Sequence, residues 1–204
     1  MLRNPLLLAS SSRYRKELLT RLGLPFSSAS PDIDESPLDG EAPEDLAIRL
    51  ATSKAKALAS AYPKHWIIGS DQVAALPDGT LLSKPGNHQN AREQLARSSG
   101  QNVNFMTGLV LLDANSGKLQ TSCDHFKVHF RDLTAPEIDA YLLKEEPYDC
   151  AGSFKMEGLG ITLFRQLEGQ DPNSLIGLPL ITLTDMLRAW GRNPLLEPAP
   201  KLPA

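Results

Sequence analysis

The chain has 204 residues, 41% hydrophobic and 22% charged, which is typical of a globular chain with one substantial core. Its formal net charge of −3 argues against a general nucleic-acid coat, although a local cluster of cations would still bind a small anion. No apolar run approaches the roughly 20 residues that span a bilayer, and the two cysteines form no CxxC pair, which fits a reducing cytoplasm.

The first third of the chain alternates short apolar runs with segments of helical spacing. Leucines recur along one side of 13–22 and of 43–61, which predicts two helices, the second with a proline in its first turn. The apolar run 6–9 predicts a short strand, and 26–30 can form a second one. The polar, acidic segment 31–40 predicts a loop.

The remainder predicts more strands and helices. Residues 66–76 are typical of a buried strand, interrupted at Gly69-Ser70-Asp71-Gln72. Alternating patterns at 105–113 and 121–131 predict a hairpin. Further helices are predicted at 87–98, 134–144 and 178–190.

The order of the predicted elements favours an α/β fold with a mixed, curved sheet flanked by helices. We expect a single domain over 1–194, with two lobes around a cleft. The proline-rich segment 195–204 is expected to be a tail.

The first predicted helix begins with an unusual charge pattern. Ser12 is a suitable N-cap, but Arg13, Arg15 and Lys16 place cations where the helix dipole favours anions. A phosphate bound by the backbone N–H groups and by Arg15 would remove this conflict. The alternative is an exposed basic turn, which costs only a few tenths of a kcal/mol.

Lys54 also interrupts a pattern. Counting in fours from Leu46 gives Leu50, Lys54 and Leu58, so an ammonium group lies along an apolar stripe. Its side chain either extends past the stripe to solvent or points into a cleft.

Asp71 places a carboxylate within an apolar strand. A buried carboxylate is costly without a partner, so Asp71 should meet a metal, a cation or a reactive water. The alternative is a turn in which Asp71 bonds the nearby backbone.

Further along, the glycine-bounded segment 152–158 carries Lys155 and Glu157, and either wraps a ligand or turns a corner.

Two other types of site find little support. His125 and His129 have the i, i+4 spacing of a helical zinc site, but their neighbours alternate as in a strand with one solvated face. The G-x-S-x-G motif of serine hydrolases is absent.

Seven short motifs, taken in order, resemble the Maf family of nucleotide pyrophosphatases over about residues 5–195. They are Leu7 to Arg15, Asp32 to Glu35, Ala51 to Ala57, Gly69 to Asp71, Lys84-Pro85, Ala151 to Ser153 and Gly177 to Leu180. The resemblance implies a two-lobed α/β fold similar to inosine triphosphate pyrophosphatase, a nucleoside triphosphate substrate, a divalent metal (Mg²⁺ or Mn²⁺) and a cytoplasmic homodimer.

The resemblance also implies roles for individual residues. Asp71 would accept the proton of the attacking water, directly or through a metal-bound water, and Glu35 would help Asp71 to hold the metal. The groups implied to bind the triphosphate are Ser10, Arg15, Lys54 and Lys84.

Within the family, the subgroup that acts on 7-methyl-GTP is the most similar. Its marks are Gln72 and the Lys155-Met156-Glu157 segment, which with Tyr14 are expected to set specificity. N7-methylation makes guanine cationic, so the ring of Tyr14 and the carboxylate of Glu157 would suit it. Arg13 and Tyr14 stand where the subgroup usually has Pro and Trp.

Two other functions remain as alternatives. One is a pyrophosphatase of the same family that prefers dTTP and UTP, whose neutral bases would give Glu157 less to bind. The other is a non-catalytic nucleotide-binding regulator of cell division. We expect neither nucleic-acid nor membrane partners.

Overall fold

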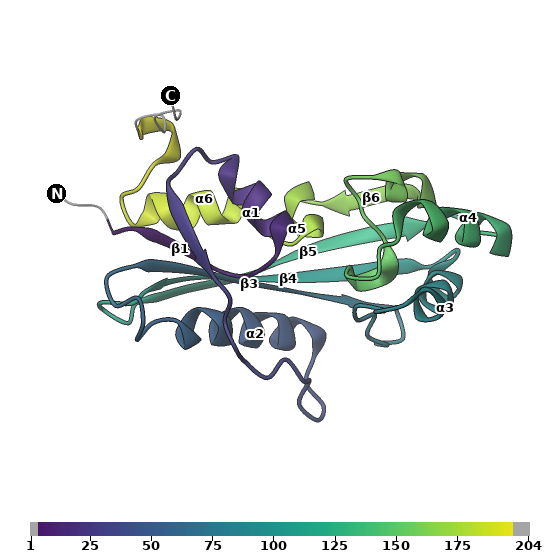
Figure 1. Cartoon of the computed structure of the whole chain (residues 1–204), viewed down its shortest axis with the longest axis horizontal. Coiled ribbons are helices and arrows are strands. Elements are labelled where there is room, and N and C mark those ends of the chain that lie inside the picture. The colour runs from purple at the N-terminus through teal and green to yellow at the C-terminus, as the bar shows by residue number, and fades with distance from the viewer. Residues whose placement is uncertain (1–3, 198–204) are drawn as a thin grey trace.

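The computed structural model describes residues 4–197, which form a six-stranded mixed sheet with helices on both faces (Figure 1). In sheet order the strands are β2 (Phe26–Ala29), β1 (Leu6–Ala9), β3 (Trp66–Ala75), β4 (Asn102–Asp113), β5 (Leu119–Phe130) and β6 (Phe164–Gly169). β1 pairs in parallel with β2 and β3, whereas β3 to β6 pair antiparallel. The predicted α/β class with a mixed sheet is confirmed.

Helices pack on both faces of this sheet. The α-helices are α1 (Arg13–Thr20), α2 (Pro43–Ala57), α3 (His88–Ser98), α4 (Ala135–Glu145), α5 (Pro172–Ile176) and α6 (Leu180–Ala189). Short 3₁₀ turns are η1 (Ala151–Ser153), η2 (Leu159–Leu163) and η3 (Pro194–Leu196). Within residues 4–197, no helix has the length and apolar character needed to cross a membrane.

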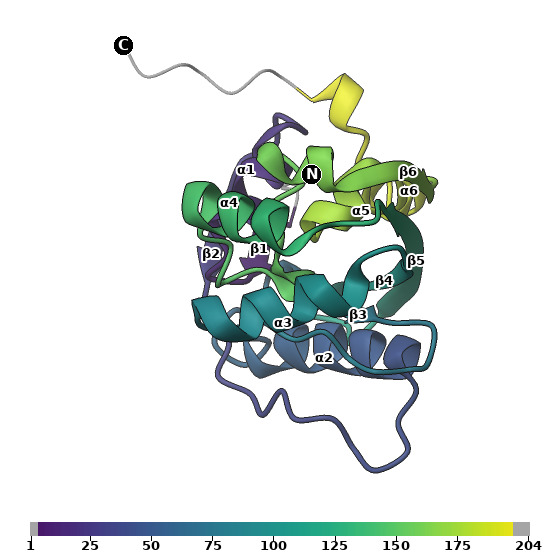
Figure 2. The ribbon, with the colours of Figure 1, turned by 90° about the vertical axis from the view of Figure 1, so that its right-hand side faces the viewer.

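The core divides along the length of the sheet. β1 is buried on both faces: Leu6 and Leu8 pack with α1 and α6, and Leu7 and Ala9 pack with α2. At the other end, aromatic residues of β4, β5 and β6 pack with α3 and α4. Figure 2 shows the ribbon from this end, with α3 and α4 towards the viewer. The expected single domain with two lobes around a cleft stays a prediction.

Two glycines allow α2 to lie directly on the sheet. A Cβ atom added at Gly69 of β3 would lie 2.1 Å from the carbonyl oxygen of Ala51, and one at Gly108 of β4 would lie 2.3 Å from that of Ala47. Any side chain at either position would push the helix away, since packed backbones cannot yield this much. The close contact buries Lys54, which projects from α2 towards β3.

Several element boundaries differ from the sequence predictions. β3 is not interrupted at Gly69 to Gln72, because its register with β4 is continuous from Trp66 to Ala75. α2 ends at Ala57 rather than at residue 61. Thr134 and Glu137 form a capping box at the start of α4. Of the predicted tail, residues 198–204 lie outside the described residues, and 195–196 belong to η3.

β6 and α5 were missing from the sequence-based prediction. β6 covers one edge of β5 with only six residues, and α5 has only five. Segments this short show too few periods for hydrophobic spacing to distinguish them from loops.

We predict that Gly69→Ala destabilises the fold by about 1–3 kcal/mol, because the added methyl group overlaps the backbone of α2. Chemical denaturation monitored by circular dichroism measures this. Thr121→Ala, on an exposed position of β5, is the control and should change stability little. Wild-type stability in Gly69→Ala would contradict the close contact.

Candidate active site

A cavity of about 820 Å³ lies where the two parts of the core meet. Its walls come from the serine-rich turn before α1, the loop before α2, the middle of β3 and the segments near residues 84 and 150–157. The predicted site residues that line it are Ser10, Tyr14, Arg15, Glu35, Lys54, Asp71, Gln72, Lys84 and Glu157.

The sheet topology explains why these segments meet. β1 pairs with β3 only as far as Leu8 and Ile68, and then ends while β3 continues. The serine-rich turn therefore begins beside the part of β3 that carries Asp71. Ligands in α/β sheets commonly bind beyond the carboxyl ends of parallel strands, and this cavity lies beyond the carboxyl end of β1.

Asp71 and Lys54 form a buried ion pair at the base of the cavity. Their exposed fractions are 8% and 6%, and the Lys54 Nζ atom contacts Asp71 Oδ1. The same ammonium group lies 2.7 Å from Oε1 of Glu35. Lys54 thus points inward rather than extending to solvent, and each buried charge has the opposite-charge partner that burial requires.

Glu35 joins this group from the loop before α2. Burial opposes its ionisation, but the hydrogen bond and charge of Lys54, with the charges of Lys84 and Arg15, outweigh that effect and lower its pKa. Glu35 is therefore ionised at neutral pH, with its carboxylate turned towards three cations of the cavity.

Arg15 reaches the cavity from the first turn of α1. Ser12 caps that helix by accepting a hydrogen bond from the Arg15 backbone N–H, and Ser10 Oγ accepts one from Ser12. The Arg15 Nε atom donates to the carbonyl of Gly177 at 2.8 Å. Burial lowers the pKa of Arg15, against the opposing charges of Asp71 and Glu35. Arginine nevertheless keeps its proton in proteins, so a bound anion would stabilise this half-buried cation.

Gln72 holds the neighbouring α5 segment. Its Nε2 atom donates to the carbonyls of Ser174 at 2.7 Å and Leu175 at 3.1 Å, and also lies 3.2 Å from Thr107 Oγ1. Although Gln72 lines the cavity, its amide nitrogen is therefore engaged with the protein. Its predicted role in specificity would fall to the amide oxygen.

Tyr14 already has a cation against its ring. The guanidinium carbon of Arg13 lies 4.7 Å from the ring centroid, and Arg13 Nη2 donates to the Tyr14 hydroxyl at 2.8 Å. A nucleobase that stacks on Tyr14 must use the other face of the ring or displace Arg13. Glu157 also lines the cavity, with an exposed side chain.

Lys155 is the predicted site residue that the structure places elsewhere. Its ammonium donates to the carbonyl of Glu145, at the C-terminus of α4, and it is not among the described residues that line the cavity. The negative end of the α4 dipole favours a cation there. The structure thus separates Lys155 from Glu157, two positions along the chain.

The carbonyl of Gly177 contributes in a way that side-chain patterns do not reveal. It accepts hydrogen bonds from both Arg15 Nε and Ser70 Oγ, the latter at 2.9 Å. It thereby joins the start of α1 to β3 beside Asp71. The only sequence signal for it is the glycine of the Gly177-Leu178-Pro179 motif.

The donor groups present fit the expected divalent metal. Asp71 and Glu35 converge on one cation, the Lys54 ammonium, and both offer carboxylate oxygens. Mg²⁺ usually takes one or two carboxylates from the protein and completes its shell with water and substrate phosphates. Asp71 and Glu35 are therefore suitable ligands for such an ion.

The Maf-like protein family model matches residues 5–190. The chain is 60% identical over 182 residues to the 7-methyl-GTP pyrophosphatase of Pseudomonas syringae pv. tomato, covering 89% of this chain and 94% of the relative. It is 59% identical over 186 residues to the protein of the same name from Pseudomonas aeruginosa, covering 91% and 96%. A solved structure of the Staphylococcus aureus Ham1 protein aligns with a TM-score of 0.45 at 14% identity, covering 63% of this chain and 72% of the other. On the family match and the identity to these relatives, the chain belongs to the Maf family.

Proposed function

We propose that this protein is a nucleoside triphosphate pyrophosphatase that hydrolyses 7-methyl-GTP to the monophosphate and diphosphate. The observation that carries the proposal is the buried Asp71 carboxylate in a cavity that also receives Arg15, Lys54 and Lys84. The names of the two Pseudomonas relatives support the choice of reaction and substrate.

In the proposed reaction, Asp71 accepts a proton from water while the water oxygen bonds to the α-phosphorus. The bond between the α-phosphorus and the α–β bridging oxygen breaks, and that oxygen leaves as part of diphosphate. Arg15 and Lys84 neutralise the charge that grows on the leaving group. A divalent ion held by Asp71 and Glu35 would supply further charge neutralisation at the phosphates.

Lys54 has two roles in this proposal. In the free protein its ammonium compensates the buried charge of Asp71. When a triphosphate binds, the phosphate oxygens offer the ammonium a second set of acceptors, which would draw it away from Asp71 and free the carboxylate for water. An exchange of partners at Lys54 therefore couples substrate binding to the availability of the Asp71 carboxylate as proton acceptor.

Recognition of the nucleobase is assigned to Tyr14 and Glu157, which line the same cavity. The methylated guanine carries a positive charge that an aromatic face and a carboxylate both attract. The guanine N1 and N2 protons would also donate to Glu157. A pyrimidine such as that of dTTP lacks both the charge and the paired donors.

We predict that Asp71→Asn lowers kcat by about 100- to 10,000-fold, because the amide cannot accept the proton from water. Diphosphate release measures turnover, and calorimetric titration with a non-hydrolysable nucleotide analogue should show that much of the binding is kept. Asp185→Asn, at an exposed position of α6 away from the cavity, is the matched control. Wild-type-like activity of Asp71→Asn would contradict the assignment of Asp71 as the proton acceptor.

We expect 7-methyl-GTP to give the highest kcat/KM in a panel with GTP, dTTP and UTP, assayed with and without Mg²⁺ or Mn²⁺. The physical reason is the cationic base described above. Faster turnover of dTTP than of 7-methyl-GTP would reject the substrate and favour the pyrimidine-specific alternative. Full activity after chelation of divalent ions would reject the metal.

Glu157→Gln should lower kcat/KM for 7-methyl-GTP by about 10- to 100-fold, the value of a hydrogen bond to a charged group. It should affect dTTP much less, since the pyrimidine does not need the carboxylate. Glu146→Gln, an exposed carboxylate that does not line the cavity, is the control. Equal losses for both nucleotides would contradict a role for Glu157 in base selection.

A further inference from the structure

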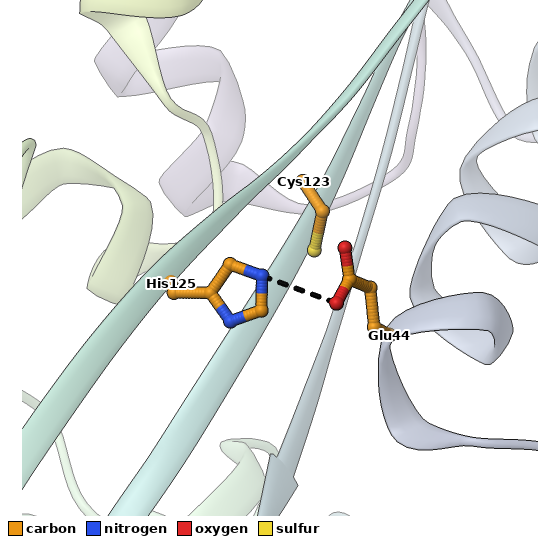
Figure 3. A group of neighbouring side chains, drawn as sticks. All are labelled: Glu44, Cys123 and His125. Carbon is orange, nitrogen blue, oxygen red and sulfur yellow. Dashed lines mark ion pairs between the residues drawn. The ribbon is translucent and has the colours of Figure 1, made fainter.

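Three side chains of metal-ligand type meet outside the cavity that holds Asp71. They are Glu44 in the first turn of α2, and Cys123 and His125 on β5 (Figure 3). One oxygen, one sulfur and one nitrogen atom lie within 4.8 Å of one another, and no other such group of three occurs within residues 4–197. The mechanism proposed above uses none of them.

The fold brings these three groups together through the close packing of α2. Cys123 and His125 are two residues apart on a strand and therefore face the same side of the sheet. Gly108, the residue directly across from Cys123 on β4, lies against the backbone of Ala47. Since no side chain at 108 separates helix and sheet, Glu44, one turn before Ala47, reaches β5.

The geometry suits a small tetrahedral ion. The His125 Nε2 and Glu44 Oε2 atoms are 3.3 Å apart. An ion with bonds of about 2.0–2.3 Å holds its ligand atoms about 3.2–3.8 Å from one another. The side chains of Glu44 and His125 are 50% and 58% exposed, so they are free to make the small rotations that bring all three atoms to this spacing.

We infer that Glu44, Cys123 and His125 form a binding site for a thiophilic divalent cation of the Zn²⁺ class, distinct from the nucleotide cavity. Mixed sulfur, nitrogen and oxygen ligands select such ions over Mg²⁺ or Ca²⁺, which prefer oxygen alone. Glu44 and His125 also line an open groove of about 710 Å³, which leaves a fourth position for water.

Charge balance agrees with this assignment. Burial, with smaller effects from the charges of Glu44 and Asp124, raises the pKa of Cys123 to about 12. The free thiol is thus protonated at neutral pH, and an ion of the Zn²⁺ class displaces that proton when it coordinates sulfur. The resulting thiolate and the Glu44 carboxylate together neutralise the charge of a divalent ion. This neutralisation offsets the repulsion between the ion and the positive N-terminal end of the α2 dipole.

The test is a zinc titration of metal-free full-length protein against a chromophoric chelator, in excess Mg²⁺ so that oxygen-only sites are filled. Wild type should bind a single ion, and Co²⁺ should give a thiolate-to-metal charge-transfer band. Cys123→Ser and His125→Ala should each weaken zinc binding by about tenfold or more and remove or shift that band. Zinc should also raise the Tm of wild type but not of Cys123→Ser.

Three controls separate this site from others. Cys150→Ser and His129→Gln change the other cysteine and the other histidine of β5, and should bind zinc as wild type does. Asp71→Asn should also bind normally, which keeps the result independent of the proposed hydrolase activity. Absence of zinc binding by wild type, or equal binding by Cys123→Ser, would overturn the inference. So would loss of binding in Cys150→Ser or Asp71→Asn, which would place the ion in the nucleotide cavity.

Discussion

The direct contact of α2 with the sheet is the constraint on which the rest of the site depends. Gly69 and Gly108 let the helix backbone lie against β3 and β4, closer than any side chain would permit. Lys54 is buried at this contact, where its ammonium needs a partner of opposite charge. Asp71 is that partner. A buried pair of this kind gains little net stability over apolar residues, so its presence points to function rather than to folding.

The change from parallel to antiparallel pairing at β3 sets where the groups proposed to bind phosphate lie. β1 ends beside the middle of β3, and the chain turns there into α1, which brings Arg15 within electrostatic reach of Asp71. A carbonyl from the far end of the chain, that of Gly177, fixes Arg15 and Ser70 together. Segments more than a hundred residues apart are thus tied at one point, which restricts the motion of the guanidinium before any ligand binds.

The parts of the site that sequence reasoning found were those in which a residue contradicts its local pattern. Asp71 in an apolar strand and Lys54 on an apolar helical stripe both violate the expected burial of charge, and the structure places them in contact. Contacts made by backbone atoms leave no such mark, so the role of the Gly177 carbonyl could not be read from composition or spacing. The expected place of Lys155 differs from the structure for a related reason. Its partner is the carbonyl of Glu145 at the end of α4, and only the tertiary fold places that carbonyl within reach.

Helix α2 also connects the cavity that holds Asp71 with the proposed metal site at Glu44, Cys123 and His125. Glu44 and Lys54 are ten residues apart on one helix, which corresponds to about 15 Å along its axis. The first turn carries a carboxylate to β5, and the last turn carries an ammonium to β3, because both turns lie against strands on the same face of the sheet. A cation at Glu44 would fix the start of this helix to β5. It would thereby limit how far Lys54 can move when it exchanges Asp71 for a phosphate, so the two sites share a mechanical element although they share no ligand.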